Sequence, residues 1–245
     1  LTGLETFMIK SMSLLLLILP FLSALALLAT RKLPARQTAL AATLANLALT
    51  LYLLANFNPD GSTNYVFNLP WVASAGINLR LCLDGIRMLR VLLTNLLAPL
   101  IVYSSFNRDF GLEGRYYGLV LLMVGALNGV FMALDGLVFY IFYELALIPI
   151  YFICAIWGGT HRIRITLKFF IYTFIGSLFM LVALLAVYLK TPAVEVAEGL
   201  PAAAHSFAWE DLVAVQRRAS TSCWLMLFFF LAFAVKMPLF PFHTW

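Results

Sequence analysis

Two ionisable side chains lie inside long apolar runs of the sequence. Glu144 stands near the middle of the run 137–157, and Lys236 lies deep in a run that begins near residue 222. A charge at the centre of a bilayer costs roughly 2.5–3.5 kcal/mol on insertion scales, so such residues usually face a bundle interior and pair or relay protons. We therefore interpret Glu144 and Lys236 as groups that move protons or ions. An ion pair that only fixes helix packing is the alternative.

Prolines interrupt the same two segments. Pro238 and Pro241 follow Lys236, and Pro149 lies five residues after Glu144. Because proline lacks a backbone donor and disfavours helix in the residue before it, the two C-terminal prolines predict a broken helix at membrane depth. Irregular backbone at that depth is tolerated where it is buried in protein or lines a water-filled cavity. A broken helix that carries a lysine is typical of ion transporters.

Two further titratable residues are candidates for a proton relay. His243 follows the broken segment, and imidazole titrates near physiological pH. Lys168 lies with Arg162 and Arg164 in the basic segment 158–168. We interpret this segment as a solvated connector, with proton uptake or a contact with a partner as the alternative role.

The composition requires lipid as the solvent for much of the chain. Of the 245 residues, 63% are apolar and 11% are charged, against about 45–50% and 25% in soluble domains. About 20 apolar residues span a bilayer core, and we place such runs at 12–30, 38–56, 83–104, 116–134, 137–157, 169–188 and from about 222. The fold class that we predict is all-α, a polytopic transmembrane helix bundle with about seven spans, the last broken and truncated.

The spans divide into two groups and alternate across the membrane. We expect residues 1–110 to hold three N-terminal transmembrane helices, and residues 111–245 to hold helices four to seven of a partial functional unit. Basic residues gather in the connectors 31–37, 105–115 and 158–168, whereas the loops 57–82 and 190–221 on the other side are poorer in them. By the positive-inside rule, the first three connectors are cytoplasmic.

No pattern in the sequence binds a cofactor. Cys82, Cys154 and Cys223 are far apart, no CxxC occurs, and the three histidines form no ligand cluster. No glycine-rich phosphate loop follows a strand pattern. The net charge of +5 is spread over loops rather than gathered in a patch, which argues against nucleic-acid binding. We predict that this chain binds no flavin, haem, iron–sulfur cluster, nucleotide or metal ion.

Three blocks of the sequence resemble one family of membrane proteins. The most specific are Glu-Leu-Ala-Leu-Ile-Pro from residue 144 and Ala-Val-Lys-Met-Pro from residue 234, with 168–173 between them. They resemble the antiporter-like proton-pumping subunits of respiratory complex I, in particular subunit M (subunit 4) of bacterial NADH–quinone oxidoreductase. The resemblance covers roughly residues 75–245. Family members are longer, so we expect this chain to be the N-terminal half of such a subunit.

The resemblance implies roles for the matched residues. Glu144 matches the glutamate of the family's fifth helix, and Lys236 matches the lysine of its broken seventh helix. In the family these two are thought to form a pair that opens and closes as protons move. His243 falls in the family's Pro-x-His stretch.

The resemblance also implies a setting for the chain. It would be a subunit of NADH:quinone oxidoreductase in the bacterial inner membrane, packed against other membrane subunits of complex I, and would itself perform no redox chemistry. NADH, flavin, iron–sulfur clusters and quinone would be bound by partner subunits. One alternative is a subunit of a cation/proton antiporter or of a membrane-bound hydrogenase from the same superfamily. A second is a non-transporting membrane scaffold.

Overall fold

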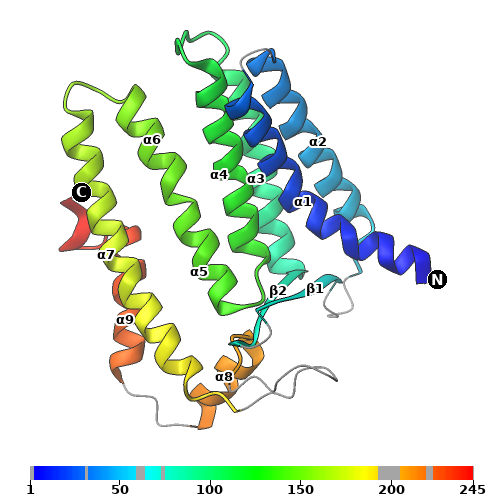
Figure 1. Ribbon diagram of the computed structural model, residues 1–245, viewed down its shortest axis with the longest axis vertical. Helices are drawn as coiled ribbons and strands as arrows, with labels where there is room; N and C mark the ends of the chain where they lie inside the picture. The colour runs from blue at the N-terminus through cyan, green and yellow to red at the C-terminus, as the bar shows by residue number, and fades with distance from the viewer. Residues whose placement is uncertain are drawn as a thin grey trace.

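The computed structural model describes residues 3–30, 33–58, 64–72, 75–192, 205–218 and 223–244. Figure 1 shows the elements within these ranges: α1 (Gly3–Ala29), α2 (Ala35–Ala55), β1 (Asn64–Val72), β2 (Ile77–Leu83), α3 (Gly85–Ser104), α4 (Glu113–Met132), α5 (Gly136–Leu145), α6 (Leu147–Trp157), α7 (Arg162–Tyr188), α8 (Trp209–Arg218), α9 (Cys223–Lys236) and the 3-10 helix η2 (Phe242–Thr244). Among the described residues, six helical segments are long and apolar enough to cross a membrane, one of them being α5 and α6 together. A shorter apolar helix, α9, adds 14 residues. The predicted polytopic helix bundle is therefore confirmed.

The helices run up and down across the bundle. α4 packs against α1, α2 and α3, α6 packs against α4 and α7, and α9 packs against α7. The C-terminal ends of α1, α3 and α6 lie at one end of the bundle, whereas the hairpin and α8 lie at the opposite end (Figure 1). This is the alternation that the distribution of basic residues requires. The division that we expect at residue 110 stays a prediction.

A short β-hairpin replaces part of what the sequence analysis treats as a polar loop at 57–82. β1 and β2 pair antiparallel, with irregular register between Asn64 and Phe67 and between Pro70 and Val72. The hairpin forms because apolar residues alternate along β2, at Ile77, Leu79, Leu81 and Leu83, which is the period of a strand with one buried face. The loop assignment was therefore wrong over the two strands.

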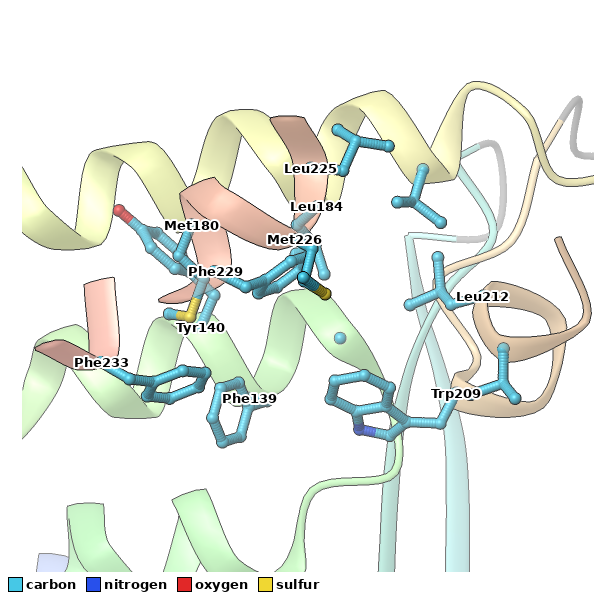
Figure 2. A pocket seen from close by; sticks show the side chains of 13 residues that line it. Phe139, Tyr140, Met180, Leu184, Trp209, Leu212, Leu225, Met226, Phe229 and Phe233 are labelled. Carbon is cyan, nitrogen blue, oxygen red and sulfur yellow. The ribbon is translucent and has the colours of Figure 1, made fainter. Parts of the chain in front are cut away.

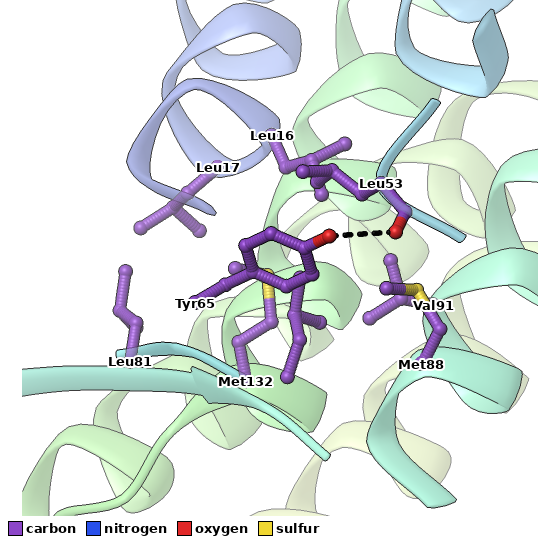
Figure 3. Close-up of a cluster of buried hydrophobic side chains, with 9 residues drawn as sticks. Leu16, Leu17, Leu53, Tyr65, Leu81, Met88, Val91 and Met132 are labelled. Atoms are coloured by element: carbon purple, nitrogen blue, oxygen red, sulfur yellow. Dashed lines mark hydrogen bonds between the residues drawn. The ribbon is translucent and has the colours of Figure 1, made fainter. Parts of the chain in front are cut away.

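The hairpin is anchored in a hydrophobic cluster formed with α1 to α4, shown in Figure 3. Leu16 of α1, Leu53 of α2 and Leu81 of β2 are fully buried there. The hydroxyl of Tyr65 donates a hydrogen bond to the carbonyl of Leu53 at 2.8 Å. Tyr65 has a positive φ of 55°, which is uncommon for a residue other than glycine, and it places the ring inside the cluster. The cluster thus ties the hairpin to the first four helices.

Prolines explain where two helices end. Pro149 has no N–H to donate to the carbonyl of Leu145, four residues earlier, and α5 ends at Leu145 while α6 begins at Leu147. Pro238 has the same effect on Ala234, whose carbonyl instead accepts from the amide of Leu239 at 2.9 Å. α9 ends at Lys236. Glu144 therefore lies one residue before the end of α5, and Lys236 lies at the end of α9.

The short segment between α4 and α5 joins three parts of the chain. The amide of Leu134 donates to Arg80 of β2 at 2.8 Å, and the amide of Gly136 donates to Phe207, just before α8, at 2.8 Å. Asp135 is fully buried, and one of its carboxylate oxygens accepts from the amides of Leu137 and Val138 at the start of α5. This segment fixes the N-terminal end of α5, the helix that carries Glu144 near its C-terminal end.

Candidate functional site

The candidate site lies where α5 and α9 both pack against α7. Glu144 is the penultimate residue of α5, and Lys236 is the last residue of α9. The ammonium of Lys236 lies over the ring of Tyr143, 3.3 Å from its centroid. Because Tyr143 directly precedes Glu144, the structure brings the two ionisable residues into one region of the bundle.

Glu144 and Lys236 are neighbours without being in direct contact. Both side chains are half-buried, and each acts electrostatically on the other. The salt bridges formed among the described residues, taken as N···O distances of up to 4.0 Å, do not include this pair. The carboxylate and the ammonium are therefore close enough to attract each other and are separated in this conformation.

Two residues of the site were not predicted from the sequence. Ser177 of α7 is buried and faces both Glu144 and Tyr140. Its own hydroxyl donates to the carbonyl of Phe174 at 2.7 Å. Tyr143 is the other residue, and its side chain is also buried. A small polar residue beside glycine, as in Gly176-Ser177, is the one sequence feature that could have drawn attention to this level of α7.

The proposed relay residues lie at a second location. The ammonium of Lys168 donates to the carbonyl of Thr244, which adjoins His243 in η2. His243 is exposed and stacks on Phe240, with ring centroids 5.7 Å apart. Lys168 lies nine residues before Ser177 on α7, which is a rise of about 13 Å. The structure thus brings His243 and Lys168 near each other, and it does not bring either into contact with Glu144.

The basic segment is helical where the sequence analysis expects a connector. α7 begins at Arg162, so Arg162, Arg164 and Lys168 all belong to its first two turns. Their side chains are exposed, so the expectation that they are solvated agrees with their placement. The connector itself is limited to residues 158–161.

An apolar cavity of about 280 Å³ lies between α5, α7, α8 and α9, next to the site (Figure 2). Phe139, Met180, Trp209 and Phe229 contribute to its walls, and Tyr140 lies on the side nearer Ser177. No charged residue lines it.

Among the described residues, no group of three or more His, Cys, Asp or Glu side chains is placed to hold a metal ion. The charged groups of the site are Glu144 and Lys236, and Tyr140 and Tyr143 lie beside them.

The comparisons with known proteins agree on the class of protein that this fold represents. Residues 133–245, which include both ionisable residues of the site, match the family described as NADH:quinone oxidoreductase/Mrp antiporter, TM. This part of the chain is therefore similar to the transmembrane region that the family describes.

More specific relatives carry the name subunit M. The chain is 37% identical to NADH-quinone oxidoreductase subunit M of Rhodobacter capsulatus, over 86% of this chain and 41% of the relative. It is 35% identical to F(420)H(2) dehydrogenase subunit M of Methanosarcina mazei, over 82% of this chain and 40% of the relative. In respiratory complex I from Thermus thermophilus with bound NADH, one chain superposes with a TM-score of 0.80 and 34% identity, over 95% of this chain and 45% of that one.

The resemblance to subunit M of NADH–quinone oxidoreductase is thereby confirmed. The chain spans less than half the length of the curated relatives named above.

Proposed function

We propose that this chain belongs to a membrane subunit of a proton-translocating NADH:quinone oxidoreductase and that Glu144 and Lys236 move protons within it. The observation that carries the proposal is the placement of a carboxylate and an ammonium, both half-buried, on two interrupted helices that pack against α7. The names of the relatives support the kind of complex.

The cost of the two charges favours a functional role. Each ionised side chain at membrane depth costs a few kcal/mol, and a close ion pair would offset part of that cost. Glu144 and Lys236 do not form such a pair in this conformation. A pair that served only to hold the helices together would be expected in direct contact, so the separation favours groups that change partners.

The proton transfer would follow from the distance between the two charges. With the Glu144 carboxylate close, the Lys236 ammonium is stabilised and keeps its proton. When the two separate, the ammonium lacks a counter-charge in a region of low dielectric, and release of its proton becomes more favourable. Electron transfer in partner subunits would supply the energy for the change. Those subunits would bind NADH, flavin, iron–sulfur clusters and quinone, while this chain would bind none of them.

The placement of the relay residues supports a direction for the path. Lys168 and His243 lie toward the end of α7 where the basic residues gather, which the positive-inside rule assigns to the cytoplasm. Protons would enter past these two residues and reach Lys236. The membrane would be the inner membrane of a bacterium, and the neighbours would be other membrane subunits of complex I and lipid.

Proton uptake into membrane vesicles, driven by NADH, tests the proposal. The complete subunit, assembled in its complex, would carry Lys236→Met. Lys190→Met, at an exposed position two residues past the end of α7, is the matched control. Since positioned proton-transfer groups contribute roughly 10²–10⁴-fold, we expect Lys236→Met to lower NADH-driven uptake by about a hundredfold or more. Lys190→Met should leave it unchanged.

Three outcomes would contradict parts of the proposal. Unchanged uptake and NADH turnover in an assembled Lys236→Met complex would show that the lysine is structural. Full uptake in the double variant Glu144→Gln with Lys236→Met would identify the chain as a scaffold. Transport that depends on a sodium gradient and not on NADH would indicate the cation/proton antiporter instead.

A further inference from the structure

The ring of Tyr143 occupies the place where a counter-ion for Lys236 would be expected. The lysine ammonium lies over the ring, 3.3 Å from its centroid. The face of an aromatic ring carries negative potential and attracts a cation within about 6 Å of the centroid, more strongly when water is excluded. The ring therefore contributes a site of attraction for the ammonium that is separate from the Glu144 carboxylate.

Packing from three helices fixes the position of this ring. Tyr143 is 9% exposed and forms a buried cluster with Met180 of α7 and Ala232 of α9. Phe139, one turn earlier on α5, lies with its ring centroid 5.9 Å from that of Tyr143. Ala232 and Lys236 are four residues apart on α9, so they share a face of that helix. The same contact between α5 and α9 thus seats the ring and presents the lysine to it.

Few other groups act on the lysine at this level. Glu144 is the charged residue that acts electrostatically on Lys236. From α7, the residues at this level are Gly176, which faces Val235, and Ser177, which faces Glu144, and neither is charged. His243, beyond the helix break, is exposed and stacks on Phe240. The ammonium therefore has two attractive partners in this part of the structure, one neutral and one anionic.

We propose that Tyr143 is a positioning residue that holds the Lys236 ammonium away from Glu144, so that the lysine alternates between the aromatic face and the carboxylate. The inference deepens the proposed function and rests on it. The ring holds the ammonium without neutralising it, because its attraction involves no net charge. The ring stabilises the ammonium less than a carboxylate does, so release of the lysine proton is more favourable on the ring than beside Glu144. The phenol hydroxyl has no part in this role.

Substitutions at residue 143 in the assembled complex separate the ring face from the rest of the side chain. Tyr143→Phe keeps the face and should retain NADH-driven proton uptake within about twofold. Tyr143→Leu removes it and should lower uptake by about tenfold, the effect expected for a partly desolvated cation–π contact. Tyr151→Leu is the matched control, since it removes a ring from the same membrane segment whose ring contacts are Phe152 and Phe170.

A double-variant cycle tests whether Tyr143 acts through the lysine. Tyr143→Leu should have no further effect on residual NADH turnover when it is added to Lys236→Met, whereas a residue with a packing role should lower turnover in both backgrounds. The pH dependence of uptake should change in Tyr143→Leu and not in Tyr151→Leu. If Tyr143→Leu does not assemble, phenylalanine analogues with increasing fluorination at residue 143 weaken the ring face at nearly constant shape.

The inference and the proposed function fail in different ways. Uptake that is normal in Tyr143→Leu, or constant across the fluorinated series, while Lys236→Met is inactive would overturn the role of the ring alone. Equal losses in Tyr143→Phe and Tyr143→Leu would overturn it as well, because the hydroxyl would then be the active group. Normal uptake in Lys236→Met would overturn the proposed function itself.

Discussion

Gly176 of α7 faces Val235 of α9 so closely that a methyl group on the glycine would lie 3.1 Å from the Val235 Cβ. Val235 directly precedes Lys236, and Gly176 directly precedes Ser177, which faces Glu144. The close approach of the two helices therefore occurs at the level of the site. It sets how far the end of α9 lies from α7, and thereby the position from which the Lys236 side chain extends.

Gly176→Val should displace the end of α9 from α7. Overpacking of this kind costs about 1–3 kcal/mol, and a shift of about 1 Å in a reacting group can lower a rate by about 10²-fold. We expect NADH-driven proton uptake by the assembled complex to fall about tenfold. Gly159→Val is the control, because nothing lies within 4 Å of a methyl group placed there. Equal uptake in the two variants would show that the helix spacing at Gly176 is unimportant.

Asp135→Ala should destabilise the junction between α4 and α5. The buried carboxylate accepts from the amides of Leu137, Val138 and Asn78 at 3.0, 3.2 and 3.3 Å. Loss of a helix cap costs about 1 kcal/mol, and a buried donor left without a partner adds about 1–3 kcal/mol. We expect a total of about 2–4 kcal/mol, measured as a lower midpoint of thermal unfolding in detergent. Asp109→Ala, which loses one exposed bond to the amide of Gly111, should lower it far less.

Asp135 should also make stability depend on pH. Burial raises the pKa of this carboxyl above its ordinary value of 3.8, although the three amides and Arg80 act in the opposite direction. Because the folded state binds the proton more tightly than the unfolded state, the stabilisation is complete below about pH 3.8 and is lost as the pH rises through the folded value. The stability of the wild type relative to Asp135→Asn should therefore decrease from pH 4 upward. Thermal unfolding of both proteins between pH 4 and 8 measures this, and an increase would contradict the assignment.

Much of the fold could be predicted because a bilayer requires long apolar helices whose backbone groups are hydrogen-bonded within the helix. Long apolar runs indicate membrane spans. Prolines indicate where a backbone hydrogen bond of the helix is missing, as at Pro149 and Pro238. The hairpin was missed although Ile77, Leu79, Leu81 and Leu83 alternate in the sequence. The apolar residues of β2 stand singly between other residues, so a search for continuous apolar runs does not detect them.

The candidate site could be predicted only in part, for a geometric reason. Glu144 and Lys236 are conspicuous because charge is rare in apolar runs. Tyr143 is one of 10 tyrosines, and no local pattern shows which of them meets the lysine. That contact depends on the rotation of α9 about its axis, which packing of Val235 on Gly176 and of Ala232 beside Tyr143 determines. Such contacts join residues about 60–90 positions apart, so they cannot be inferred from local periodicity.

Asn95→Leu should weaken the group formed by α1 to α4 without touching the candidate site. The Asn95 side chain is fully buried. Its oxygen accepts from the amides of Asn46 and Asn128 at 2.9 and 3.2 Å, and its own amide donates to the Thr50 hydroxyl at 2.9 Å. Hydrogen bonds between membrane helices contribute about 0.6–2 kcal/mol each. Loss of these three should therefore lower the free energy of unfolding by about 2–6 kcal/mol.

Asn56→Leu provides the matched control, because the side-chain amide of Asn56, the C-cap of α2, donates at an exposed position to the carbonyl of Tyr52. Thermal unfolding of the purified subunit should separate the two variants by several degrees. Proton uptake per assembled complex should be equal in both, since the asparagine cluster lies in α2, α3 and α4, whereas the two ionisable residues lie on α5 and α9. A loss of uptake in fully assembled Asn95→Leu would show that the cluster is coupled to the candidate site. Equal melting temperatures would mean that the three bonds contribute little, as happens when the unfolded chain in the membrane finds other partners for the same amides.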